Sequence, residues 1–447
     1  MNKEMKNYVR LSIALLTFCI VFSCGLKKEA KKEMRQKEMI RETIYVASNR
    51  PEANSIVAFT ADNNGKLKKV GEFNTGGKGT GNIEIFDWGY DVTHPLKDGI
   101  DPLISAYGIF KTSDNKNILV VNSGDGTISS MRIMENKSLI VSDIKPTSDA
   151  HPLSIASHNR LVYVASAGDR IENPSAPPFT GSITGYTIDE SGKLRPINNS
   201  TRDLKARPSC IAFTPDGKFV VVNELVTGFV KVFGVNSDGT LSKEPISMKA
   251  CPHEVKNGRW LAIPVGFDIV QKGNSYVVLV SEARFLNNKG MLREEKNRVP
   301  QSPLYSWQTG STSSFIINSS GKINLVSGDV MTGKNMEGGQ IANCWVEASH
   351  DGNILWAANA LSSSISSYAI NSTGEITLRN EVAYKEPSEK LFFSDLHLGK
   401  NGKYLYQLIG NMGEIKVFET QSNGNLKSIG QYAGLPQVGA YGVIVVY

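Results

Sequence analysis

The sequence predicts an all-β protein, a seven-bladed β-propeller whose ring is closed by its C-terminal strand. Short runs with apolar residues at every second position recur along the chain. Turn signals such as Pro-Asp-Gly at 215–217 and Asp-Gly at 238–239 separate them. The chain also ends in a single alternating run, 442–447, that no further run follows. Four-stranded units of this kind cannot bury both faces alone, so they stack radially as blades.

The first 42 residues differ from the repeats. Three basic residues, Lys3, Lys6 and Arg10, precede an uncharged run over 11–22 that is short for a membrane span. The Ser-Cys pair at 23–24 resembles a bacterial lipobox, which predicts a signal peptide over 1–23 and lipidation of Cys24. A plain signal peptide or a membrane anchor with an incidental cysteine is the alternative.

A charged tether over 24–42 then leads to the propeller domain, 43–447. Lys and Arg alternate with Glu at helical spacing in this tether, as in a solvated segment. The lipid at Cys24 would make the membrane a partner. We therefore expect a lipid-anchored protein of the bacterial cell envelope, either periplasmic or on the cell surface.

Charge excludes one class of partner. The chain has 49 Lys and Arg against 43 Asp and Glu, but ten of the basic residues and only five of the acidic ones lie in 1–42. The propeller domain is therefore nearly neutral. Nucleic-acid binding needs clustered positive charge, so no nucleic-acid partner is expected.

Seven repeat units can be followed along the chain. They begin at residues 44, 109, 155, 211, 269, 345 and 396, and the third and fifth resume after loops, at 181 and 311. The first unit starts with the strand that is second elsewhere. If 442–447 supplies its missing inner strand, seven complete blades close with no lone edge.

These residues resemble the lactonase-type seven-bladed propellers, which include bacterial 6-phosphogluconolactonase and the muconate cyclases. The resemblance rests on the blade pattern and on Asn-Glu-Leu at 223–225 behind Pro-Asp-Gly. Five further stretches are similar to one outlying branch of the family: 101–103, 121–124, 266–268, 281–283 and 344–345. The resemblance implies the fold more firmly than the reaction.

The muconate-cyclase-like relatives imply a working set of one His, two Arg and the Glu of Asn-Glu-Leu. Here Leu153 stands at the His position, Ser209 at the first Arg position, and Ala360 at the second. Only Glu224 matches. Opening a lactone needs a proton carrier and a positive group for the developing oxyanion. We therefore predict that the family mechanism is lost, with His151 as a candidate replacement for the His or simply a residue bonded to backbone.

Two columns of residues are expected near one mouth of the central channel, from overlaying the inner strands. The first is Tyr107, Leu153, Ser209, Phe267, Asn343, Ser394 and Tyr441; the second is Gly108, Ser154, Cys210, Asp268, Cys344, Asp395 and Gly442. The first column forms either a wall for an uncharged or aromatic ligand or a packed plug. In the second, the Cys and Asp side chains fill tight strands, hold a metal, or carry a reactive thiol. No cofactor is expected.

Two function classes remain. The first, which the sequence favours, is a ligand-binding or partner-binding module with a degenerate lactonase site, formed by the channel mouth with Trp345 and by inserted loops at 170–180 and 285–307. The second is a hydrolase acting on an extracytoplasmic lactone or related cyclic metabolite. Its candidate bases are Glu224, Glu282 and Asp268. His94, His253 and the glycine-rich stretch 76–81 are interpreted as loop residues without chemistry.

Overall fold

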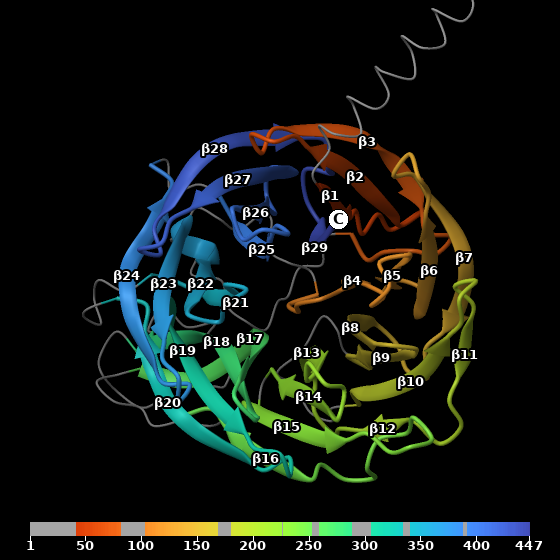
Figure 1. Ribbon diagram of the computed structural model, residues 1–447, viewed down its shortest axis with the longest axis horizontal. Helices are drawn as coiled ribbons and strands as arrows, with labels where there is room; N and C mark the ends of the chain where they lie inside the picture. Colours follow the sequence, from red (N-terminus) through yellow and green to blue (C-terminus); the bar gives the residue numbers. More distant parts are fainter. Residues whose placement is uncertain are drawn as a thin grey trace, which may run out of the picture.

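The computed structural model describes residues 42–81, 103–168, 180–225, 227–252, 259–287, 305–333, 340–387 and 391–447. Seven antiparallel sheets of four main strands each stand around a central axis, which confirms the predicted propeller (Figure 1). Cys24, His94, His253 and most of the 170–180 loop lie outside the described residues. Within the described residues, no helix is long and apolar enough to cross a membrane.

Blade 1 joins the two ends of the propeller domain. Its strand order is β29 (Tyr441–Val446), β1 (Glu42–Ala47), β2 (Ser55–Ala61) and β3 (Leu67–Asn74). β29 pairs antiparallel with β1, with Ile44 opposite Val445, and the two strands lie side by side in Figure 1. The predicted closure is therefore confirmed. β1 begins one residue earlier than the domain boundary set from the sequence.

The remaining blades follow in chain order, each running from the axis outwards. Blades 2 to 4 are β4 (Ile109–Lys111), β5 (Asn117–Asn122), β6 (Thr127–Ile133), β7 (Leu139–Pro146); β8 (Pro152–His158), β9 (Leu161–Ser166), β10 (Ser182–Ile188), β11 (Leu194–Pro196); and β13 (Pro208–Phe213), β14 (Phe219–Glu224), β15 (Phe229–Gly234), β16 (Ser247–Ala250). The two-residue β12 (Arg202–Asp203) also pairs with β10.

Blades 5 to 7 are β17 (Arg259–Lys272), β18 (Ser275–Asn287), β19 (Tyr305–Ile317), β20 (Ile323–Met331); β21 (Asn343–Ala348), β22 (Ile354–Asn359), β23 (Ser364–Ile370), β24 (Ile376–Lys385); and β25 (Phe393–Leu398), β26 (Tyr404–Ile409), β27 (Glu414–Thr420), β28 (Leu426–Ala433). A short 3₁₀ turn, η3 (Ala360–Ser362), follows β22. The hairpin of β18 and β19 reaches Asn287 and Tyr305, so both ends of the inserted loop predicted over 285–307 are strand.

Burial explains why the inner strands are apolar and the outer strands alternate. β5 and β14 are buried at every position because blades cover both of their faces. In the outer strand β3, by contrast, only Leu67 is fully buried. The Pro-Asp-Gly turn joins β13 to β14, with Gly217 at φ 72° and its N–H bonded to Thr214 O at 2.8 Å. A side chain at that φ would be strained, which accounts for the glycine.

The glycine-rich stretch 76–81 is a loop, as predicted, and it packs between blades 1 and 2. Gly124 N donates to Lys78 O at 3.0 Å, and a Cβ on Gly124 would lie 2.0 Å from Gly79 O. The glycines here allow two backbone segments to touch. They account for the stretch without a phosphate ligand.

Gly124→Ala is therefore expected to destabilise the protein by about 1–3 kcal/mol or more, because the methyl group meets fixed backbone. Gly234→Ala is the matched control, since the nearest atom to its added Cβ is a methyl group of Ile246 at 3.8 Å. Thermal unfolding of both variants checks this. Equal melting temperatures would contradict the close packing.

Candidate active site in the central channel

The upper mouth of the channel, where the inner strands begin, is crossed by residues 103–107, here called the plug. Ser105 Oγ donates to Leu153 O in blade 3 at 2.9 Å. From the opposite side of the ring, Trp345 Nε1 in blade 6 donates to Ser105 O at 2.9 Å. The plug thus connects blades that are not neighbours. It fills the mouth where the family resemblance places its working groups.

Arg207 and Tyr107 fix the two ends of the plug. The buried Arg207 guanidinium donates to Leu103 O at 2.6 Å and to Ile104 O at 3.4 Å. Tyr107 reaches across the axis, and its hydroxyl donates to Phe267 O in blade 5 at 2.9 Å. Ile104 and Tyr107 have φ of 44° and 60°, a strained region for such side chains. The surrounding hydrogen bonds hold this conformation.

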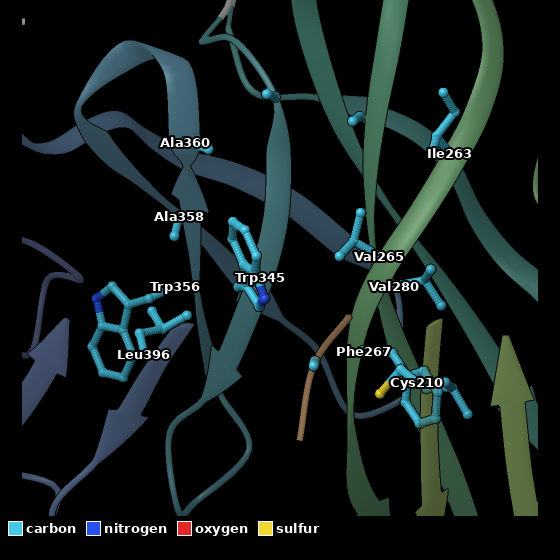
Figure 2. Packing of buried hydrophobic residues seen from close by; sticks show 14 of the residues in the cluster. Cys210, Ile263, Val265, Phe267, Val280, Trp345, Trp356, Ala358, Ala360 and Leu396 are labelled. Atoms are coloured by element: carbon cyan, nitrogen blue, oxygen red, sulfur yellow. The ribbon is translucent and has the colours of Figure 1, made fainter. Parts of the chain in front are cut away.

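Most residues of the predicted ligand-binding set are packed below the plug. Those that are buried are Ser209, Cys210, Phe267, Trp345, Asp395 and Tyr441. Phe267 and Cys210 lie together in one cluster, and Trp345 comes to it from a neighbouring strand (Figure 2). Tyr441 donates its hydroxyl hydrogen to Val121 O at 2.6 Å. Leu153, Ser209, Phe267 and Tyr441 of the first column are thus buried among other side chains.

His151 lies at the same mouth, between blades 2 and 3. Its Nδ1 lies 2.9 Å from Ser123 O, and the ring is half-buried. A carbonyl oxygen only accepts, so Nδ1 carries the hydrogen. His151 is therefore bonded to backbone, which was one of the two expectations for it.

Glu224 and Glu282, two of the predicted bases, are neutralised inside their own blades. Glu224 forms an ion pair with Lys231 and accepts a hydrogen bond from Thr227. Glu282 accepts from Arg284 at 2.8 Å, and the side chains of both residues are fully buried. Each of these carboxylates is therefore engaged by a basic side chain of its own blade. Asp268 differs from both.

Side-chain acceptors link consecutive inner strands at two levels of the channel. At the upper level, Ser154 Oγ accepts from Ile211 N at 3.1 Å, and Asp395 Oδ2 accepts from Gly442 N at 2.9 Å. Cys210 belongs to this level, because its thiol accepts from the Phe267 backbone. Burial raises the pKa of the Cys210 thiol well above its usual range, so it is not a reactive thiolate.

At the lower level, the side chain of Asp268 in β17 and that of Glu347 in β21 make equivalent contacts. Asp268 Oδ2 accepts from Ala348 N at 2.8 Å, and Glu347 Oε1 accepts from Leu398 N at 2.8 Å. Ala348 directly follows Glu347, and Leu398 directly follows His397. Asp268, Glu347 and His397 therefore occupy corresponding positions in three successive blades.

This arrangement corrects the second column predicted from the sequence. That column placed Asp268 level with Cys210 and Cys344, but β17 has an irregularity between Pro264 and Phe267 that shifts the later residues along the strand. Asp268 consequently lies one level deeper. No group of three or more His, Cys, Asp or Glu among the described residues could hold a metal ion.

Asp268 has an unusual protonation equilibrium. Burial, followed by the negative charge of Glu347, raises its pKa to about 7, although the Ala348 and Ile269 amides and His397 act in the opposite direction. The pKa of Tyr107 is also raised, first by burial and then by Asp268. The Tyr107 side chain is thus close enough to Asp268 for the charge of Asp268 to act on its pKa.

His397 completes the set. Its Nδ1 lies 3.2 Å from Glu347 Oε1, and its side chain is 25% exposed, so water reaches the ring. Asp268 and Phe110 are likewise half-buried. Lys111, whose pKa is lowered by burial and partly restored by Glu347, donates to Val445 O at 2.8 Å at the lower mouth. Asp268, Glu347 and His397 thus lie in successive blades, and the charge of Glu347 also acts on Lys111.

Asp268 is among the candidate bases predicted from the sequence, whereas Glu347 and His397 are not. One signal could have found them, since each of the three stands five residues before a turn glycine with positive φ: Gly273, Gly352 and Gly402. Counting back from these glycines aligns the parts of the inner strands that follow the register shifts. An alignment from the strand starts puts these parts out of register.

The model of the family described as "Lactonase, 7-bladed beta-propeller" matches residues 107–253 and 307–441. The chain belongs to this lactonase family. No curated protein matches the chain. The family assignment explains the blade pattern, but it leaves the reaction of this member open because its upper mouth is filled.

Solved structures share the family's fold. A proposed 6-phosphogluconolactonase from Bacteroides fragilis has 18% identity and a TM-score of 0.57, covering 91% of this chain and 98% of its own. A periplasmic gluconolactonase from Pseudomonas aeruginosa has 14% identity and a TM-score of 0.59, covering 91% and 99%. A Lactobacillus plantarum protein has 14% identity and a TM-score of 0.61, covering 92% and 100%. At these identities the likeness concerns the fold alone.

Proposed function

We propose that this lactonase-family propeller is a hydrolase that opens a small lactone or related cyclic ester in the lower half of its channel. The observation that carries the proposal is the meeting of Asp268, Glu347 and His397 from three successive inner strands below Tyr107. Family membership supports the reaction class. The site itself differs from the set that the resemblance implied.

The chemistry of ester opening fits these groups. It needs a base for the attacking water and a proton for the departing oxygen, each contributing about 10²–10⁴-fold in rate. His397 and Asp268 are of the right types, and Lys111 supplies positive charge at the same mouth. Among the described residues no Lys or Arg forms an ion pair with Asp268, and the charged partner of His397 is Glu347.

Lipidation of Cys24 remains part of this proposal and would place the site outside the cytoplasm, in the bacterial cell envelope. Support comes from the basic start, the short uncharged run and the Ser-Cys pair at 23–24. The tether over 24–42 would then hold the propeller off the membrane. A substrate from outside the cytoplasm follows from this location.

The second candidate is the binding module, with a small uncharged ligand or a protein as its partner. The plug favours it, because residues 103–107 fill the mouth where the family resemblance places catalysis. A member that has lost this site and kept its ring would bind without turnover. The two candidates differ in whether any cyclic ester is consumed.

Proton release during incubation with a panel of sugar and aromatic lactones separates the candidates. The wild-type protein is expected to turn over at least one lactone, and His397→Gln to lower kcat by about 10²–10⁴-fold. His350→Gln is the matched control, because the His350 imidazole contacts Gly399 O at 2.9 Å, two residues after His397. Turnover that His397→Gln leaves intact would overturn the proposed site. No turnover of any lactone would favour the binding module.

A further inference from the structure

We propose that Asp268, Glu347 and His397 act as one proton relay, in which His397 is the base, neutral Asp268 is the acid, and Glu347 is a positioning residue. This inference rests on the proposed function but concerns where the protons are held. It is independent of which lactone is the substrate.

Glu347 fixes both the orientation and the tautomer of His397. One oxygen, Oε1, accepts from Leu398 N at 2.8 Å and lies 3.2 Å from His397 Nδ1. The same carboxylate oxygen therefore accepts a hydrogen bond from the Leu398 backbone and lies at ion-pair distance from the ring of the preceding residue. A ring nitrogen facing a carboxylate carries its hydrogen, because two lone pairs would repel. The lone pair of neutral His397 is thus on Nε2, away from Glu347.

Nothing among the described residues uses Nε2. The 3.2 Å contact at Nδ1 is the polar contact that the His397 ring makes there, and no hydrogen bond to Nε2 occurs in the described part of the chain. The His397 side chain is 25% exposed, so solvent reaches the ring. A water molecule is its natural partner.

Asp268 is arranged to hold a proton. The titratable groups that act on it or that it acts on are Tyr107, Cys210, Glu347 and His397. Glu347 is the one whose negative charge raises the pKa of Asp268, whereas Tyr107 and Cys210 are neutral near pH 7 because burial raises their own pKa values. The hydrogen bonds that Asp268 accepts from two backbone amides, Ile269 N at 2.7 Å and Ala348 N at 2.8 Å, favour the ionised form but are outweighed by burial and by Glu347. A carboxyl group in such surroundings stays neutral nearer to pH 7 than an exposed one.

The relay balances. His397 Nε2 takes a proton from water, whose oxygen bonds to the lactone carbonyl carbon as the carbonyl π electrons move to oxygen. When the carbonyl re-forms, the bond between the acyl carbon and the ring oxygen breaks, and that oxygen takes the proton of Asp268. The product is the hydroxy acid. Transfer of one proton from His397 to Asp268 then restores the starting state with no oxidant or reductant.

Selective ¹⁵N labelling of histidine tests the positioning role without turnover, since the chain has six His. We expect the His397 ring, assigned with His397→Gln, to be protonated at Nδ1 and bare at Nε2 above neutral pH. Glu347→Gln should mix the two tautomers and lower kcat about tenfold or more with little change in KM. His350→Gln should leave the His397 signals in place. An Nε2–H tautomer in the wild type would overturn the inference.

Infrared spectroscopy tests the acid. A protonated-carboxyl band is expected at pH 6 and should be absent in Asp268→Asn. If the band and the Nδ1–H tautomer are both found but no lactone is consumed, the proposed function fails while the proton arrangement stands. If lactones are consumed but Asp268 is ionised at pH 6, the relay is wrong and the hydrolase assignment survives.

Discussion

Deleting residues 441–447 is expected to abolish folding of the propeller, because the ring then cannot close. β29 is the inner strand of blade 1, and without it the buried strand β1 becomes an open edge. The deletion removes five buried side chains: Tyr441, Val443, Ile444, Val445 and Val446. At about 1.5–3 kcal/mol each, the loss is on the order of 10 kcal/mol, which equals the whole stability of a typical domain.

Circular dichroism melts and gel filtration check this expectation. The control is deletion of Tyr447 alone, a 48% exposed residue whose ring is contacted by Lys111 at 4.4 Å and by Lys400 at 5.0 Å. That control should fold and elute as the parent protein does. A monomer of the longer deletion with a cooperative melt would show that the ring does not depend on its last strand.

The propeller could be predicted because its determinants are local. Each unit carries its own period-2 runs and its own turn residues, as in the Pro-Asp-Gly turn at 215–217. The closure could also be predicted, since 442–447 had no partner among its sequence neighbours. These features need no knowledge of contacts between distant residues.

The site could be predicted only in part, because its levels depend on strand irregularities. Between Pro264 and Phe267 the register of β17 shifts, and this moved Asp268 away from the column in which the sequence placed it. An irregularity leaves no mark in the period-2 pattern beyond a break in alternation. Glu347 and His397 were missed for the same reason. Their common spacing of five residues from the turn glycines aligns these strands more reliably than the strand starts do.

The sequence did not predict that residues 103–107 cross the channel mouth. Tyr107 was aligned with the channel wall, whereas its side chain spans the axis to Phe267 O. The direction follows from the left-handed backbone at Ile104 and Tyr107, with φ of 44° and 60°. Ile and Tyr do not favour that region, so the turn could not be predicted from the sequence. Tertiary hydrogen bonds impose it.

Asp268→Asn is expected to be more stable than the wild type at pH 8, by a margin larger than at pH 5. The reason is that the wild type must ionise Asp268 at pH 8, and the fold disfavours the ionised carboxylate. With a folded pKa of about 7 against about 3.9 unfolded, the folded state binds more protons between these values, so stability falls as pH rises through this window. From pH 5 to pH 8 this group costs the wild type about 2–3 kcal/mol. Asparagine removes that pH dependence. The gain in stability is reduced because the NH2 group of asparagine cannot accept one of the two backbone hydrogen bonds that Asp268 accepts.

Asp216→Asn is the control of opposite sign. Although burial alone would raise its pKa, hydrogen bonds from Tyr276, Lys218 and Thr214 hold the pKa of Asp216 well below its usual range. Its stabilising contribution is complete above the unfolded pKa, so Asp216→Asn should destabilise the protein equally at pH 5 and pH 8. Urea unfolding of the two variants and the wild type at both pH values makes the comparison.

A stability of Asp268→Asn that follows the wild type from pH 5 to pH 8 would mean that Asp268 is ionised throughout and serves only to link blades 5 and 6. A flatter dependence would mean that the fold keeps a group that costs stability at neutral pH. Residues that lower stability in this way are typical of functional sites, where activity requires a strained or disfavoured arrangement. The same substitution should then remove turnover while it strengthens the fold. A variant that is both more stable and inactive would be hard to explain for a purely structural carboxylate.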